Sequence, residues 1–221
     1  MKSVCSLIGG PGVGKGTFAK IICARLGWKH VSLGDVLRVR AEEDTPTGRD
    51  LRILMAEGSL VSDALANRII LDTCTSSLDK GVLLDGYPRT LQQAQFFDQA
   101  YGAHRVVNVL LEEHIVVAKL LGRRICRTCG EGFNLAGIQD HTYDMPAILP
   151  NPATCKLSRC NPVLVLREDD TEQTIRRRIA SHNEQSQPIL DYYEKAGRLK
   201  QFRVRKGVKD VDALIETMLK S

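Results

Sequence analysis

Apolar positions along the chain form short continuous runs that alternate with longer stretches of helical spacing. The short runs predict five strands, at residues 3–8, 29–33, 81–87, 105–111 and 201–205. Because helical stretches separate these strands, we expect right-handed βαβ units and a parallel sheet that is covered by helices on both faces. The pattern therefore predicts an α/β fold.

Two segments depart from this alternation. Apolar residues with helical spacing predict helices at residues 18–27, 62–76, 89–102, 112–124, 169–197 and 211–221. Residues 33–61 are also helix-like but are broken near "DTPTG" and "EGSL", and residues 123–167 have little helical period and many Gly, Pro and Asn residues. We interpret both segments as excursions from the sheet.

The stretch "GGPGVGKGT" joins the first predicted strand to the first predicted helix. A strand, a glycine turn and a helix N-terminus together hold anions through backbone N–H groups. The spacing of Gly9, Gly14 and Lys15 fits the P-loop pattern, although Gly16 follows the lysine and the hydroxyl comes at Thr17. The alternative is an ordinary turn with a solvated lysine. We favour a phosphate cradle because pattern and context agree.

Composition distinguishes between the classes of ligand that this phosphate cradle could bind. The chain has 31 Lys and Arg against 26 Asp and Glu, and a net charge of +5 suits an anionic small ligand as well as a nucleic acid. Its densest basic run is "RRR" at 176–178, and only 5% of the residues are aromatic, which argues against a nucleic-acid partner. No apolar stretch approaches a membrane span, so we expect a soluble, cytoplasmic protein without a membrane partner.

Charged side chains cluster where such a sheet binds ligands. Asp85 and Arg89 follow a predicted strand, at the edge where the glycine loop also lies. Asp85 can hold Mg²⁺ directly or through water, or cap the next turn. Arginine matches phosphate oxygens, and several converging arginines could neutralise a multi-phosphate transition state. Further candidates at the ends of elements are Arg38, Arg123, Arg124, Arg167 and Arg178.

Six motifs in order give the chain its resemblance to adenylate kinases: "GGPGVGKGT", "HVSLGDVLR", "EGSLVSD", "LLDGYPRTLQQA", "LLGRRI" and "LREDDTEQTIRRRI". The resemblance covers essentially the whole chain. It implies the P-loop NTPase fold, with a core of residues 1–32, 62–122 and 168–221, a nucleoside-monophosphate-binding domain at 33–61 and a lid at 123–167. It further implies a monomeric enzyme of nucleotide biosynthesis that reversibly transfers the γ-phosphoryl group of Mg·ATP to AMP, yielding two ADP.

The resemblance also assigns residues to the donor, ATP. Lys15 would follow the transferring group and Thr17 would reach Mg²⁺. Lys119 would lie near the donor base, where many relatives use an arginine that stacks on adenine, and Phe133 and Gly207 would flank the base. The donor phosphates would be cradled by Gly12, Val13, Gly14, Lys15, Gly16 and Thr17.

For the acceptor, AMP, the resemblance implies phosphate contacts from Arg38 and Arg89 and a pocket lined by Gly86, Leu60 and Val61. Arg123, Arg167 and Arg178 would close on the phosphates in the transition state, and Asp169 and Asp170 would help the lid to close. No general base is needed, because the AMP phosphate is already ionised near neutral pH.

Two residues bear on the acceptor base. Leu33 stands where adenylate kinases usually carry threonine, so recognition there would be steric and apolar. Gln93 matches the family glutamine that pairs with adenine, whereas UMP/CMP kinases usually carry asparagine there and a short lid. We therefore expect AMP, with GMP, UMP or CMP as alternative acceptors. A P-loop switch or hydrolase, and a zinc-bearing nucleic-acid module, are the alternatives from other classes.

Four of the seven cysteines fall within one short stretch. Cys126 and Cys129 form C-x2-C, and Cys155 and Cys160 form C-x4-C after 25 intervening residues. This spacing suits a structural, four-thiolate zinc site, as in the lids of many related kinases, with His141 as a substitute ligand. Reduced thiols or a disulfide are the alternatives, and an intracellular location disfavours the disulfide.

Overall fold

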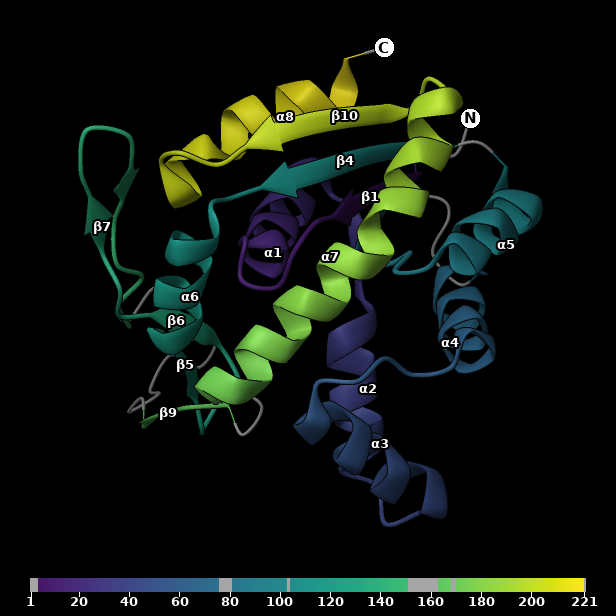
Figure 1. Cartoon of the computed structure of the whole chain (residues 1–221), viewed down its shortest axis with the longest axis horizontal. Coiled ribbons are helices and arrows are strands. Elements are labelled where there is room, and N and C mark those ends of the chain that lie inside the picture. The colour runs from purple at the N-terminus through teal and green to yellow at the C-terminus, as the bar shows by residue number, and fades with distance from the viewer. Residues whose placement is uncertain (1–3, 76–80, 103, 151–162, 168–169, 221) are drawn as a thin grey trace.

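The computed structural model describes residues 4–75, 81–102, 104–150, 163–167 and 170–220 (Figure 1). No helix within these ranges is long and apolar enough to cross a membrane.

A five-stranded sheet forms the centre of the molecule. Its strands lie in the order β10-β4-β1-β3-β2, and every neighbouring pair is parallel. This confirms the predicted α/β architecture and the number of strands in its sheet. The strands are β1 (Val4–Ile8), β2 (Lys29–Ser32), β3 (Val82–Asp85), β4 (Arg105–Leu110) and β10 (Leu199–Arg203).

Helices cover both faces of this sheet because side chains alternate along its strands. Leu7 and Leu83 share one core cluster with apolar residues of α1, α6, α8 and the start of α7, whereas Ile8 and Leu84 pack into clusters with residues of α4, α5 and the later part of α7. Figure 1 shows α7 crossing in front of the sheet. The helices outside the two excursions are α1 (Lys15–Leu26), α4 (Asp63–Thr75), α5 (Leu91–Tyr101), α6 (Glu113–Leu121), α7 (Glu172–Lys195) and α8 (Val211–Leu219), with a 3-10 helix, η1 (Gly207–Asp210), before α8.

Hydroxyl side chains set where four helices begin. Ser32, Thr45, Thr90 and Thr171 each accept a hydrogen bond from the backbone N–H three residues further on. Such N-caps satisfy one of the four N–H groups that a helix start leaves without a partner. They fix the starts of α5, α7 and two helices that begin at Leu33 and Pro46, and these four helices carry many of the site residues.

The first excursion is a pair of helices, α2 (Leu33–Ala41) and α3 (Pro46–Glu57), which follows β2 in the chain and lies on the side of the sheet opposite β10 (Figure 1). The break that the sequence predicts at "DTPTG" separates them. Helix α3 ends at Gly58, whose φ of 73° favours glycine. Thr174 Oγ1 and Arg177 Nη1 of α7 donate to the carbonyls of Ala56 and Glu57, at 3.3 and 2.9 Å, so α3 is held against α7.

The second excursion contains short strands that the sequence did not predict. Strands of two to four residues are too short to show a period of two, which explains why they were missed. Strand β5 is the centre of an antiparallel sheet in the order β6-β5-β9, and β7 and β8 form a separate hairpin. Their bounds are β5 (Arg123–Cys126), β6 (Gly132–Asn134), β7 (Ile138–Gln139), β8 (Asp144–Met145) and β9 (Leu164–Val165).

Candidate active site

The glycine loop between β1 and α1 is too tightly enclosed to carry side chains at Gly9 and Gly12. Gly9, Gly12 and Gly14 have φ values of 133°, 76° and 97°. A Cβ atom at Gly9 would lie 2.3 Å from the carbonyl oxygen of Val109, and one at Gly12 would lie 2.7 Å from Leu120 Cγ. The first turn of α1 has neither a side-chain cap nor an acidic residue. Its N–H groups therefore suit an anion.

Lys15 lies at the start of α1, inside this loop. Its Nζ donates to the carbonyls of Gly9 and Gly10, at 2.7 and 2.6 Å. Burial lowers the pKa of Lys15 to about 8. The Asp85 carboxylate opposes this shift, while nearby arginines add to it. An ammonium group in surroundings that disfavour its charge would gain from an approaching phosphate. Thr17, two residues further along α1, is exposed.

Asp85 ends β3 beside the start of α1. Its Oδ2 would lie 3.1 Å from a Cβ atom at Gly16 and lies 3.4 Å from His30 Nε2. His30 is a site neighbour that sequence reasoning had interpreted as surface or structural. The parallel pairing of β2 with β3, in which Ser32 is opposite Asp85, brings it there. This pairing joins residues far apart in the sequence, so the pattern around His30 gave no signal.

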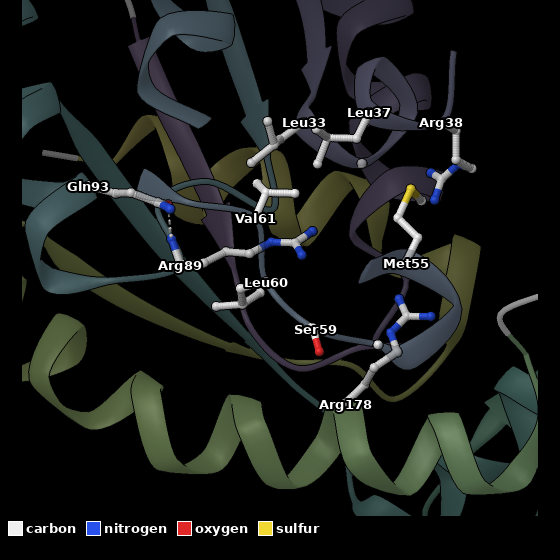
Figure 2. A pocket seen from close by; sticks show the side chains of 12 residues that line it. Leu33, Leu37, Arg38, Met55, Ser59, Leu60, Val61, Arg89, Gln93 and Arg178 are labelled. Atoms are coloured by element: carbon white, nitrogen blue, oxygen red, sulfur yellow. Dashed lines mark hydrogen bonds between the residues drawn. The ribbon is translucent and has the colours of Figure 1, made fainter. Parts of the chain in front are cut away.

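A pocket lies between the α2–α3 pair, the end of β3 and α7 (Figure 2). It brings together six of the seven residues predicted for the acceptor, and Gly86 adjoins them through its carbonyl, which accepts from Arg89 Nε at 2.8 Å. Leu37 also lines it, one helical turn after Leu33, as do Met55 and Ser59, to which the sequence assigned no role. The lining residues are Leu33, Gly34, Leu37, Arg38, Met55, Gly58, Ser59, Leu60, Val61, Arg89, Gln93 and Arg178.

The Gln93 side chain is held in one orientation at the back of this pocket. Its Oε1 accepts from the Arg89 backbone N–H at 2.7 Å, and its Nε2 donates to Asp63 Oδ1 at 2.8 Å. These two partners identify which end of the amide is oxygen. One acceptor position and one N–H group of the amide remain for further hydrogen bonds. Gln93 is 1% exposed, so a base would meet a rigid group.

Arginines from separate elements lie close enough around the pocket for the positive charges of two of them to lower the pKa of a third. Burial lowers the pKa of Arg89 to about 10, and the charges of Arg178 and Arg38 add to this while Asp85 opposes it. Figure 2 shows the three guanidinium groups directed toward the same space. Arg38 pairs with Asp35. The charge of Arg167, after β9, also helps to lower the pKa of Asp35.

A buried carboxylate, Asp170, contacts Arg178 and one further arginine, Arg123. Arg123 Nε lies 2.6 Å from Asp170 Oδ2, and a second hydrogen bond joins Arg123 Nη2 to Oδ1. Arg178 Nη1 lies 3.8 Å from the same Oδ1. The charges of Arg123 and Arg178 both act on Lys15. All five arginines predicted for phosphate contacts therefore lie around the pocket and the glycine loop. Asp169 lies outside the described residues.

His182 of α7 borders the glycine loop and was interpreted from the sequence as surface or structural. A Cβ atom at Gly10 would lie 3.5 Å from its Cδ2. Burial lowers the pKa of His182 to about 4, and the charges of Lys15 and Arg89 act in the same direction. The imidazole is therefore neutral at physiological pH. Its position on one helical face with Arg178 was the available signal.

Three residues expected near the donor base have other neighbours. Phe133 is 2% exposed and packs with Cys126 in a small cluster of the β6-β5-β9 sheet, so it is enclosed rather than open to a base. Lys119 Nζ donates to the Ala136 carbonyl at 2.7 Å. Gly207 begins η1, where a Cβ atom would lie 3.5 Å from Met145 Cβ. The expectation for Phe133 thus differs from the structure because the ring fills the core of its own sheet.

Two of the four cysteines predicted as zinc ligands are described. Cys126 and Cys129 lie in a tight turn that is closed by hydrogen bonds from Cys126 N to Glu131 O and from Gly130 N to Cys126 O, both 2.8 Å. Cys155 and Cys160 lie outside the described residues. Within the described part of the chain, no group of three or more His, Cys, Asp or Glu side chains is placed to hold a metal ion, and His141 is exposed. The structure therefore does not show the zinc site.

Comparison with known proteins agrees with this geometry. The family model described as adenylate kinase matches residues 7–198. A GTP:AMP phosphotransferase of Plasmodium falciparum is 36% identical, over 93% of this chain and 91% of its own length. An adenylate kinase of Borrelia turicatae is 34% identical, over 96% of this chain and 97% of its own. Adenylate kinase 1, chloroplastic, of Arabidopsis thaliana is 37% identical, over 91% of this chain and 72% of its own. The chain is a phosphotransferase of the adenylate kinase family.

Proposed function

We propose that the protein reversibly transfers the γ-phosphoryl group of ATP to AMP, giving two ADP, in a Mg²⁺-dependent reaction. One observation carries the proposal: a partly buried Lys15 in a glycine loop adjoins arginines from several elements, which also border a separate pocket. A donor phosphate site next to an acceptor pocket is the arrangement that transfer between two nucleotides requires. A nucleotide switch would need no second pocket.

The reaction follows from positioning and charge. An acceptor phosphate oxygen forms a bond to the γ-phosphorus, and the bond from that phosphorus to the β–γ bridging oxygen breaks and leaves ADP. The acceptor oxygen is already ionised, so no side chain has to remove a proton. Lys15 follows the moving phosphoryl group, Arg38 and Arg89 hold the acceptor phosphate, and Arg123, Arg167 and Arg178 offset the charge that spreads over the equatorial oxygens. The residues of the glycine loop and of the acceptor pocket keep the roles that the resemblance assigns to them.

Thr17 and Asp85 are the residues that would hold Mg²⁺, directly or through water. A hydroxyl and a carboxylate are the hard oxygen ligands that this ion prefers, and Asp85 lies beside the first turn of α1, which carries Thr17. The ion would neutralise charge on the β- and γ-phosphoryl oxygens.

Exclusion of water is the second requirement, because water would otherwise accept the phosphoryl group. The contacts of α3 with Thr174 and Arg177 hold it against α7, and the neighbouring residues Gly58 and Arg178 line the acceptor pocket. We assign residues 33–61 to acceptor binding and residues 123–167 to a lid over the phosphates. The bond between Arg123 and Asp170 would link that lid to α7.

Adenine is the proposed acceptor base. Leu33, which is 1% exposed, offers the base an apolar wall, and the fixed Gln93 amide has one donor and one acceptor position left. The relative from Plasmodium is named for GTP as donor and AMP as acceptor. Lys119 cannot provide the stacking face that an arginine would, so selection of the donor base is loose.

A structural zinc ion is part of the proposal. The turn that carries Cys126 and Cys129 brings two thiols together at the edge of a small sheet, which suits half of a four-thiolate site. Cys155 and Cys160 would complete it. The ion would order this segment and would have no open position for chemistry. Cytoplasmic location and a monomeric state also remain proposals.

The experiment that tests the function measures transfer from Mg·ATP and Mg·GTP to AMP, GMP, UMP, CMP and no acceptor, with both products resolved. Product formation that depends on AMP supports the proposal. Preference for another monophosphate would contradict the acceptor assignment, and phosphate release without an acceptor would favour a hydrolase or switch.

A further inference from the structure

The segment 134–145 contacts the first of two elements that are expected to flank the donor base. At its beginning, Asn134 Nδ2 donates to the backbone carbonyl of Lys119, at 2.7 Å. The Lys119 ammonium group in turn donates to the Ala136 carbonyl, also at 2.7 Å. Two hydrogen bonds of opposite direction thus tie the segment to the end of α6. They fix both the backbone and the side chain of Lys119.

The other end of the segment contacts the second element, η1. Asp144 N donates to the Arg205 carbonyl at 3.0 Å, and Lys209 Nζ pairs with Asp144 Oδ2 at 2.8 Å. Met145 packs against Gly207, where an added Cβ atom would lie 3.5 Å from Met145 Cβ. Figure 1 shows this hairpin beside the turn that leads from β10 into α8. The segment therefore bridges α6 and η1.

This bridge is well packed. Tyr143 and Met145 are each 2% exposed and belong to the main core cluster, together with residues of α1, α6 and α8. The Arg205 guanidinium lies over the Tyr143 ring, 5.5 Å from its centroid. The turn before Tyr143 is closed by Asp140 Oδ1, which accepts from the N–H groups of Thr142 and Tyr143 at 2.6 and 2.8 Å. The neighbouring β6-β5-β9 sheet has its own small cluster instead.

We propose that the segment 134–145 positions the donor-base site by fixing the distance between Lys119 and η1. Met145 and the pair of Asp144 with Lys209 are its positioning residues. This inference rests on the proposed function, because it takes the donor site to lie between these elements. A fixed gap lowers the entropy cost of binding a planar base. It has no such effect on the phosphates, which the glycine loop holds, or on the acceptor, which binds on the other side of that loop.

Met145→Ala tests the proposal, because it removes the buried side chain beyond Cβ, including the Cγ that lies beside Gly207. Met218→Ala is the matched control: Met218 is 1% exposed, belongs to the same core cluster and lies on α8. Calorimetry would measure binding of ATP and of inorganic tripolyphosphate, which lacks a base. We expect Met145→Ala to weaken ATP binding about tenfold and to change tripolyphosphate binding less than about twofold, and Met145→Leu to restore ATP binding. Met218→Ala should leave the ratio of the two affinities unchanged.

A second variant, at an exposed residue, keeps the proposal testable if Met145→Ala does not fold. Lys209→Met breaks an exposed ion pair and should weaken ATP binding about two- to fourfold, whereas Arg25→Met, which breaks the exposed pair of α1 with Asp212, should have no effect on it. Equal weakening of both ligands, or unchanged ATP binding in both Met145→Ala and Lys209→Met, would overturn the proposal. A wild-type protein that binds ATP but phosphorylates no monophosphate would contradict the proposed function, and the binding comparison would still decide the role of Met145.

Discussion

Asp170 pairs with Arg123 through both carboxylate oxygens, across 47 positions of the sequence, and its side chain has no exposed surface. Arg178 lies within 3.8 Å of the same carboxylate. One buried negative charge therefore holds two guanidinium groups beside Lys15. Without it, these positive charges would repel one another in a region that is partly closed to water.

Asp170→Asn should therefore destabilise the protein and lower its activity. Removal of one partner from a buried ion pair leaves an uncompensated charge, and we expect the free energy of unfolding to fall by about 3 kcal/mol. Chemical denaturation measures this change. Because the variant has an excess of positive charge, added sulfate should recover part of the lost stability. Equal stability of variant and wild type would show that Asp170 does not offset these charges.

Lys15→Met should lower the activity without lowering the stability, unlike Asp170→Asn, which should lower both. The lowered pKa of Lys15 means that its surroundings disfavour the charge, so the variant should be at least as stable as the wild type. Transfer should nevertheless slow by a factor of about 10² to 10³, because the group that follows the phosphoryl charge is gone. Steady-state rates and thermal unfolding of the same preparations test this pair of outcomes. Retained activity would remove Lys15 from the proposed chemistry.

The lowered pKa of His182 predicts that the free energy of unfolding decreases in mild acid. Its pKa is about 4 in the folded protein, against an ordinary value of 6.5. Between these values the unfolded chain binds a proton that the folded chain does not, so the free energy of unfolding falls as the pH decreases from 6.5 to 4. Above this window the residue contributes no pH dependence.

In His182→Gln, the free energy of unfolding should decrease by about 2 kcal/mol less over this pH range than in the wild type, after allowance for partial solvent screening. Denaturation of both proteins at intervals from pH 7 to pH 4 measures the difference. Curves that run parallel over this range would mean that His182 does not stay neutral beside Lys15.

Removal of metal tests the cysteine cluster. We expect about one zinc ion per chain in the purified protein, and a fall in the unfolding midpoint of about 5 °C on treatment with a chelator. Cys126→Ser should reduce the metal content, whereas Cys23→Ser, which changes a thiol in the main core cluster, should not. Metal-free protein with an unchanged midpoint would exclude the structural zinc ion.

Local patterns predicted much of the fold and part of the site. The glycine loop can be recognised from the sequence because its glycines and its lysine are neighbours in the chain. Leu33 and Val61 can be recognised for the same reason, since each lies within a motif of contiguous residues. Contacts between distant residues had no such signal. The bond of Gln93 with Asp63 spans 30 positions.

The second excursion shows a further limit. Its strands are too short for periodicity, and Tyr143 and Met145 join the main core from a stretch that the sequence had interpreted as loop-like. Burial of these side chains depends on the position of η1, some 60 residues later in the chain. A pattern of apolar residues cannot contain that information.

The central claim is that the phosphoryl group passes from one nucleotide to another. The most direct measurement follows γ-labelled ATP in a single turnover with the enzyme in excess and AMP and Mg²⁺ present. We predict that the label appears in ADP made from AMP, and that little of it becomes inorganic phosphate. Label released as phosphate at the same rate with and without AMP would contradict it.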